Sequence, residues 1–429
     1  MRLSLILFAL SLHAQTFTTV CNGDTSGANG GCALNASTMP NSRGFLNGLP
    51  YDSVNGEFLY YTGTATGNTN NASIYSSEIW GYNASTRTFA FRVGNGASSI
   101  STGAGNTRCG QEGSPASTYN PLVGHPQGYL DFDDTHGQMY ATWQLCGGNY
   151  MGYTAFYVAA SHTFGTALAK APLTTGDGTT NATGRDYRHL TWVSGAAKGI
   201  FCCDNNSTTY QVVEFDGTTT YTDVSGSVTG ADSMACSSSS HCPPAPLTAF
   251  AAMSDGTNLW IYGGCNGTTP GSTGASNACS GTNQNDLYKY AVATKIFTKI
   301  SPSGTKPVAT YASFPFAAYS STRGSILVYS DNNTLKEYTI ATNTWSTVST
   351  SGSGPAFGDG TGNSLANHMD GNLAGWDVAS NRLVLIHPGA CSGCFQSTSP
   401  AVYDVTFPST TTVSKLGGGK IMTGGAIRH

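Results

Sequence analysis

Short runs of alternating apolar and polar residues recur along the chain, and Gly, Asn, Asp and Ser bound most of them. Alternation with a period of two residues is typical of β-strands, and clusters of those four residue types are typical of turns. After the first fourteen residues, no long stretch has apolar positions at helical spacing. The pattern therefore predicts an all-β protein.

The runs fall into six quartets, and the second run of each is the clearest. In "LWIYGG", both the Leu259 and Ile261 face and the Trp260 and Tyr262 face are apolar, so each sheet must be covered on both sides. Radial stacking of sheets around an axis achieves this. We therefore predict a six-bladed β-propeller with four antiparallel strands per blade. Its second strands read "EFLYYTG", "QMYATWQ", "GIFCCDN", "LWIYGGC", "SILVYSD" and "RLVLIHP".

The strands of the first blade are predicted near residues 45–52, 57–63, 78–84 and 87–93. The last two strands of the sixth blade are predicted within "VYDVTFPSTTTV". The turns from first to second strand and from third to fourth strand are tight. The other links are long and include residues 95–126, 171–188, 226–247, 265–284 and 352–371. Because antiparallel strands reverse direction, all the long links are expected on one face of the disc, where binding loops usually lie.

The fourth and fifth quartets resemble kelch repeats, the repeats that form the central domain of galactose oxidase. The resemblance rests on a double glycine that ends the second strand, and on residues of the third and fourth strands that have the spacing found in kelch repeats. It extends from about Phe45 to Leu416 and implies a kelch-like propeller, a fold that serves both enzymes and binding proteins. The matching residues are Gly263, Gly264, Asn285, Asp286, Tyr290, Thr294 and Phe297, then Tyr338, Thr342 and Trp345.

The first residues, "MRLSLILFALSLHA", combine one positive charge, a short apolar run and a small residue at Ala14. This pattern is typical of a secretory signal peptide. No other apolar run is long enough for a membrane-spanning helix. We expect a secreted protein, extracellular or periplasmic, without a membrane span. Its predicted parts are a signal peptide (1–14), a disulfide-bearing N-terminal segment (15–44), the propeller (45–419) and a C-terminal tail (420–429).

Composition narrows the choice of partners. Only 10% of the residues are charged and the net charge is −4, so the chain has no basic field for nucleic acid. Aromatic residues make up 11% of the chain, which argues for a packed core rather than for disorder.

Twelve cysteines in an exported chain indicate disulfides. Proximity predicts the pairs Cys21–Cys32, Cys236–Cys242, Cys265–Cys279 and Cys391–Cys394, whereas the partners of Cys109, Cys146, Cys202 and Cys203 cannot be assigned. Cys391 and Cys394 also have the spacing of a zinc knuckle, with His387 nearby, but a structural zinc site needs a second such pair. We predict no metal site and no cofactor.

Superposing the blades places a set of polar residues at the channel mouth on the loop-rich side. They either tie down loops or form a ligand site, in which arginine forks would bind a carboxylate or sugar hydroxyls. The predicted ligand-binding residues are Arg43, His125, Arg185, Asp186, Arg188, His189, His368 and Asp370. Stacking surfaces would come from Tyr119, Trp143, Tyr150, Tyr311 and Phe357.

Two classes of function fit this sequence. The first is a secreted propeller that binds a glycan or an extracellular protein through its loop-rich face. The second is a carbohydrate-active hydrolase or lyase on an acidic sugar, which would need two carboxylates from the set Glu112, Asp186, Asp204, Asp232, Asp359 and Asp370. A copper radical oxidase like galactose oxidase is a remote third possibility. Because no catalytic motif is visible, the sequence favours the binding protein over an enzyme.

Overall fold

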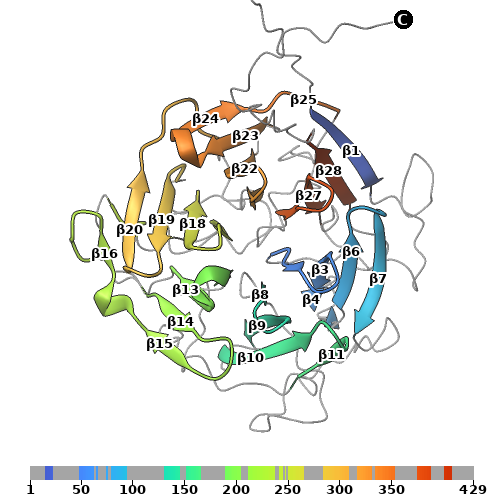
Figure 1. Ribbon diagram of the computed structural model, residues 1–429, viewed down its shortest axis with the longest axis horizontal. Helices are drawn as coiled ribbons and strands as arrows, with labels where there is room; N and C mark the ends of the chain where they lie inside the picture. The colour runs from blue at the N-terminus through green and yellow to red at the C-terminus, as the bar shows by residue number, and fades with distance from the viewer. Residues whose placement is uncertain are drawn as a thin grey trace, which may run out of the picture.

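The structure is a computed structural model of the 429-residue chain. It describes residues 15–22, 48–61, 64–65, 74–75, 79–93, 130–144, 151–165, 189–203, 211–236, 241–244, 247, 250–264, 284–308, 316–330, 334–352, 374–387 and 401–407. These residues form six small antiparallel sheets arranged around an axis, as Figure 1 shows. The predicted all-β, six-bladed propeller is confirmed.

The first three blades follow one another along the chain. Blade one contains β2 (Tyr51–Asp52), β3 (Glu57–Tyr61), β6 (Ile79–Asn83) and β7 (Thr88–Val93). Blade two contains β8 (Leu130–Asp133), β9 (Gln138–Gln144), β10 (Met151–Val158) and β11 (Thr163–Phe164). Blade three contains β12 (His189–Val193), β13 (Lys198–Cys202), β14 (Val213–Phe215) and β15 (Tyr221–Asp223). Within the described residues, the strands predicted for blade one agree with those observed to within a residue at their ends, except that residues 48–50 are not in a strand. Residues 45–47 and 62–63 lie outside the described residues.

The other three blades repeat this order. Blade four contains β17 (Ala251–Ser254), β18 (Asn258–Tyr262), β19 (Leu287–Ala291) and β20 (Ile296–Ile300), with β16 (Thr229–Gly230) added parallel to β20. Blade five contains β21 (Phe316–Ser320), β22 (Ser325–Ser330), β23 (Thr334–Thr339) and β24 (Thr344–Thr347). Blade six contains β26 (Ala374–Asp377), β27 (Arg382–His387), β28 (Ala401–Thr406) and β1 (Gln15–Asn22).

A few small elements complete the described residues. They are β25 (Thr350–Ser351), the two-stranded sheet of β4 (Thr64–Ala65) and β5 (Ile74–Tyr75), and the 3-10 turns η3 (Ser194–Ala196), η4 (Ser225–Ser227) and η5 (Ile340–Thr342). No helix long and apolar enough to cross a membrane occurs in the ranges given above.

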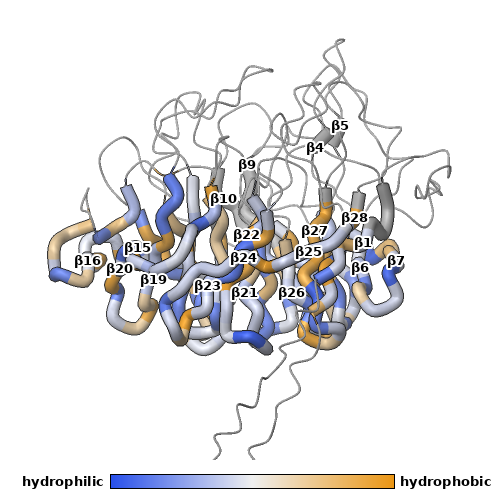
Figure 2. Tube along the Cα trace, turned by 90° about the horizontal axis from the view of Figure 1, so that it is seen from above, coloured by the Kyte–Doolittle hydropathy of each residue, from blue (hydrophilic) through white to orange (hydrophobic). Residues whose placement is uncertain are grey.

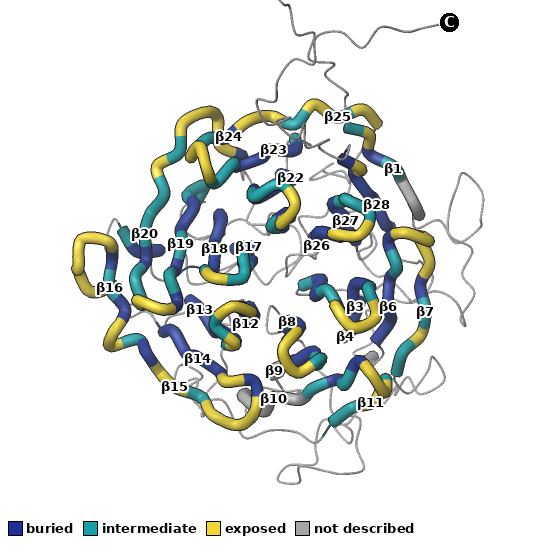
Figure 3. Tube along the Cα trace, in the orientation of Figure 1, coloured by how far each residue is buried: buried dark blue, intermediate teal, exposed yellow. Residues whose placement is uncertain are grey.

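Packing between blades explains why both faces of each strand are apolar. Leu259 and Ile261 of β18 pack with residues of blade three, such as Val193 and Ile200. Trp260, which alternates with them, packs with blade five. The hydrophobic effect therefore acts across every seam of the ring, and Figure 3 shows buried residues in the strands and exposed residues in the turns.

In blades one, two and six, the tight turn is held by a carboxylate at the end of the first strand. Asp52 Oδ1 accepts hydrogen bonds from the backbone amides of Val54 (2.8 Å) and Asn55 (3.1 Å). Asp133 and Asp377 hold their own turns in the same way. A left-handed residue then leads into the second strand, as at Gly56 (φ 67°). These buried aspartates therefore have a structural role, and the turns lie along one edge of the disc in Figure 2.

The ring closes with strands from both ends of the described chain. Thr16 to Asn22 of β1 pair antiparallel with Ala401 to Thr406 of β28, so the N-terminal strand is the outer strand of blade six. Phe17 of β1 is buried against Tyr329 of blade five, with ring centroids 5.2 Å apart. The repeat pattern did not reveal this role for residues 15–22. The second half of "VYDVTFPSTTTV" lies outside the described residues.

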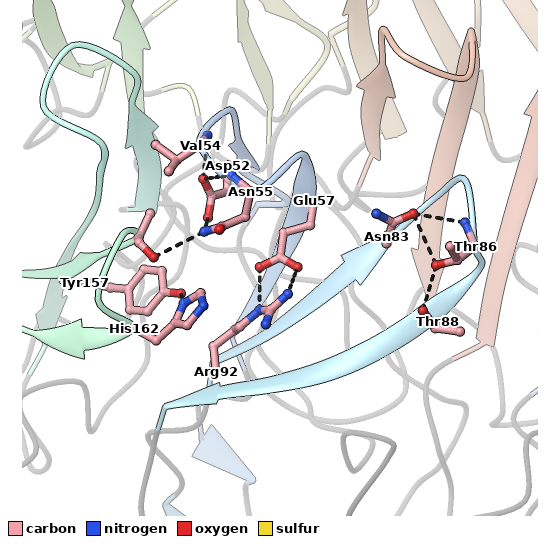
Figure 4. Close-up of polar contacts among 11 residues, drawn as sticks. Asp52, Val54, Asn55, Glu57, Asn83, Thr86, Thr88, Arg92, Tyr157 and His162 are labelled. Atoms are coloured by element: carbon pink, nitrogen blue, oxygen red, sulfur yellow. Dashed lines mark hydrogen bonds and ion pairs between the residues drawn. The ribbon is translucent and has the colours of Figure 1, made fainter.

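The seam between blades one and two is polar at its rim, as Figure 4 shows. Glu57 is buried and receives a two-pronged ion pair from Arg92, both in blade one. Asn55 Nδ2 donates to the carbonyl of Ala159 in blade two at 3.2 Å. Tyr157 of blade two bonds to His162 Nδ1 at 2.6 Å. Each of these polar groups has a partner within the fold, so we assign them to blade packing.

Candidate binding channel

A cavity of about 400 Å³ occupies the axis of the propeller. Its wall is built by the first strand of every blade and by the turn that follows each of those strands. Cavities of this size are typical of small-molecule sites. Because the first strands ring the axis, as β8, β12, β17 and β26 do in Figure 3, one equivalent position from each blade contributes to each level of the wall.

Strand pairing defines three such levels. The upper level lies two residues before the end of each first strand and contains Pro50, Asp131, Thr191, Ala252, Ala318 and Gly375. The middle level is rich in aromatic residues and contains Tyr51, Phe132, Trp192, Met253, Tyr319 and Trp376. The rim, at the start of the turns, contains Ser53, Asp134, Ser194, Asp255, Ser321 and Val378.

Asp131 is the one carboxylate of the upper level. Its side chain is half-buried, and Oδ2 accepts a hydrogen bond from the backbone amide of Trp192 in blade three at 2.6 Å. Oδ1 accepts from the amide of Phe132 at 2.8 Å. Burial raises the pKa of Asp131 to about 7, although the two amide donors lower it, and the nearby carboxylates of Asp134 and Asp133 raise it further. Asp131 therefore titrates near neutral pH.

Two more carboxylates line the rim. Asp134 Oδ1 accepts from the indole Nε1 of Trp192 at 3.0 Å, and burial raises the pKa of Asp134 despite this bond. Burial alone would raise the pKa of Asp255, but donors from Asn258 and Trp260 outweigh it and lower that pKa. Asp255 is therefore ionised at neutral pH. Asp134 and Asp131 both accept a hydrogen bond from Trp192, Asp134 from its indole and Asp131 from its backbone amide.

The charge of this wall has one sign. The lining residues include three carboxylates and no Lys, Arg or His. Five of the six middle-level residues are aromatic, and Tyr51 and Tyr319 are only half-buried. The described wall can therefore accept hydrogen bonds from a ligand and pack rings against it, but it offers no cationic fork for an anion.

The sequence-predicted site lies at the loop-rich mouth, and most of it falls outside the described residues. His189 is the first residue of β12, and its backbone pairs with Cys202 of β13. Arg43, His125, Arg185, Asp186, Arg188, His368 and Asp370 are among the residues that the structure does not describe. These ligand-binding assignments stay predictions.

The structure also describes only some of the predicted carboxylates and aromatic residues. Asp232 is described, and its Oδ2 lies 2.6 Å from His241 Nδ1, a bond that lowers the pKa of Asp232. This contact joins two parts of the segment that Cys236 and Cys242 also close, so it anchors a loop. Trp143 lies in β9, but its side chain is not described. The rest are outside the described ranges: Glu112, Asp186, Asp204, Asp359, Asp370, Tyr119, Tyr150, Tyr311 and Phe357.

Two disulfides occur in the described part of the chain. Cys236 pairs with Cys242, as predicted, with Cα atoms 5.4 Å apart. Cys202 pairs with its neighbour Cys203 at the end of β13, a connection that the sequence did not indicate. All four are buried in the core between blades three and four. The predicted pairs Cys21–Cys32, Cys265–Cys279 and Cys391–Cys394 rest on cysteines whose side chains lie outside the described residues.

Sequence reasoning missed Asp131 and Asp134, although a signal was present. The segments beginning at Leu49 and Leu130 superpose without a gap, and the second residue is proline in one and aspartate in the other. Four of the other five blades have an apolar or small residue at this position. An acidic residue there indicates a candidate functional site. The described residues contain no group of three or more His, Cys, Asp or Glu side chains that could hold a metal ion.

Comparison with family models and with curated proteins gives no family and no function for this chain. No family model matches this chain, and a search of curated proteins finds no similar sequence.

Proposed function

We propose that this chain is an exported, kelch-type β-propeller that binds a glycan, and that the described part of the binding site is the central channel. The observation that carries this proposal is the cavity of about 400 Å³, whose lining includes six aromatic residues and three carboxylates. Aromatic rings pack against the apolar faces of sugars, and carboxylates accept hydrogen bonds from their hydroxyls. The predicted residues of the loop-rich mouth, such as Arg185 and His368, would extend the site at the other end of the channel.

Export is part of the proposal. The predicted signal peptide ends at Ala14, directly before Gln15, the first residue of β1. Removing the leader there would leave the closing strand intact. Two buried disulfides also favour an oxidising compartment.

Tyr319 offers the sharpest test of glycan binding. It lines the cavity and is half-buried, so replacing it with Ala removes a ring from the wall with limited effect on the core. A glycan array followed by calorimetry should show wild-type binding, and Tyr319→Ala should bind about tenfold more weakly. The matched control is Phe91→Ala, because Phe91 is an exposed aromatic of the outer strand β7.

The outcomes separate glycan binding from a purely structural channel. Both variants should melt within a few degrees of the wild type. A wild-type protein that binds no glycan, or a Tyr319→Ala variant that binds as the wild type does, would reject the channel as a glycan site. Capture of an extracellular protein instead would support the other partner class that the sequence allowed.

A second candidate function is glycan hydrolysis. Hydrolases of this kind use one protonated and one ionised carboxyl group, and the pKa of Asp131, about 7, lies in the range of such an acid. Asp134 lines the same cavity. Release of reducing ends from a bound glycan, abolished by Asp131→Asn while binding persists, would establish the enzyme. Binding without any turnover would leave the protein as a binding module.

A further inference from the structure

The carboxylates of the channel differ from several carboxylates elsewhere in the fold that form ion pairs. Glu57 is matched by Arg92, Asp404 by Arg87, and Asp286 by Lys299 and Lys306. Asp131, Asp134 and Asp255 instead meet only neutral donors among the described residues, namely amide and indole N–H groups and a side-chain amide. Asp52 and Asp377 also meet only neutral donors, but these lie mainly within their own turns, and neither carboxylate lines the cavity. Among the described residues, Asp131, Asp134 and Asp255 therefore line the cavity without a cationic partner.

An uncompensated carboxylate inside a cavity has an energetic consequence. Low-dielectric walls focus the field of charges that line a cleft, which raises the local concentration of ions of the opposite sign. The three carboxylates belong to blades two and four, on either side of Thr191, Trp192 and Ser194 of blade three. A cationic group at this part of the wall would therefore gain attraction from more than one side.

We infer that the ligand of this channel carries a cationic amine, as an amino sugar with a free amino group does. This inference rests on the proposed glycan binding and specifies the class of glycan. Asp131 and Asp134 would receive the ammonium group through charge-assisted hydrogen bonds. The aromatic faces of the middle level, such as Tyr319, favour a cation over an anion.

The charged groups around Asp131 define how binding depends on pH. Asp133 and Asp134 of its own strand region are acidic, β12 presents Thr191 and Trp192, and β2 presents Tyr51 and the buried Asp52. The basic side chain of the same turn, His136, has its Nδ1 2.5 Å from Asp133 Oδ2 and is not among the residues that line the cavity. Because the pKa of Asp131 is raised to about 7, its charged form becomes populated as the pH rises towards that value. An ammonium ligand binds the charged form, so its affinity should rise from about pH 5.5 to about pH 7.

Calorimetry with three related sugars tests the inference. Glucosamine carries the ammonium group, whereas N-acetylglucosamine and glucose are neutral. The wild type should bind glucosamine about tenfold more tightly than either neutral sugar at about pH 7. Asp131→Asn should keep the acceptor for the Trp192 amide but lose the preference for glucosamine. Asp216→Asn is the matched control, because Asp216 is an exposed turn carboxylate outside the channel lining and should keep the preference.

The possible failures are distinguishable. Equal affinity for the three sugars would overturn the amine inference and leave glycan binding standing. Tighter binding of an acidic sugar would overturn it as well. If none of the sugars and no member of a glycan array binds, both the inference and the proposed function fail. A preference for glucosamine that survives in Asp131→Asn would reject the role of this carboxylate.

Discussion

Arg87 of blade one forms a two-pronged ion pair with Asp404 of blade six, with Nε donating to Oδ2 at 2.8 Å and Nη2 donating to Oδ1 at 3.0 Å. Asp404 is completely buried, and Arg382 of its own blade lies 3.6 Å away. Arg382 also donates to the carbonyl of Ala84 in blade one at 2.8 Å. The cluster joins the first and last blades, where the ring has to close.

Asp404→Ala is expected to destabilise the protein strongly, by about 3–5 kcal/mol, because it leaves two arginines without their buried carboxylate. Arg87→Ala should cost less, since Arg382 still faces Asp404 and Arg87 is partly exposed. Chemical denaturation of both variants measures the difference. An Asp404→Ala variant as stable as the wild type would show that this ion pair does not stabilise the closure.

The closing strand β1 gives a second prediction. Phe17 is 5% exposed and contacts the ring of Tyr329, so Phe17→Ala should cost about 3 kcal/mol and speed amide exchange in β28. Thr16→Ala on the same strand is the control, because Thr16 is exposed and should change stability little. Unchanged exchange in β28 of the Phe17→Ala variant would contradict this closure.

A third prediction concerns the upper level of the channel wall. A Cβ added at Gly375 would lie 2.2 Å from Cε1 of Phe58 in blade one, so Gly375→Ala forces the two blades apart locally. We expect a loss of about 1–3 kcal/mol in thermal or chemical unfolding. Gly226→Ala is the matched control, since no atom lies within 4 Å of the position of its added Cβ. Equal stability of the two variants would mean that the seam between blades six and one tolerates the extra methyl group.

Asp131 gives a prediction about pH and stability. Its folded-state pKa, about 7, is above the ordinary value of 3.8, so the folded protein binds the proton more tightly than the unfolded chain. Stability should therefore fall as the pH rises between these two values, by at most about 1.4 kcal/mol per pH unit from this group. This pH-dependent contribution is absent in Asp131→Asn. The difference in the free energy of unfolding between the wild type and this variant should therefore become smaller as the pH falls. A difference that does not depend on pH would contradict the raised pKa.

Local sequence determined the blades and their turns. Alternation in "LWIYGG" required a covered sheet because Leu259 and Trp260 point to opposite faces and both are apolar, and the structure packs them against different blades. The aspartates that end the first strands of blades one, two and six, such as Asp52, bond to backbone amides two and three residues further along the chain. The pair Cys236–Cys242 is close in sequence and could be predicted for the same reason.

Only the tertiary structure decided which distant strands and side chains meet. The sequence alone places residues 15–22 in an N-terminal segment outside the propeller, and only the structure shows that Thr16 to Asn22 pair with β28 at the other end of the chain, because hydrogen bonding between strands carries no sequence code of its own. In the same way, Asp131 and Trp192 are ordinary strand residues until six first strands converge on one axis. The convergence creates the cavity and the burial that shifts the pKa of Asp131, so the candidate site is a property of the closed ring and not of any one repeat.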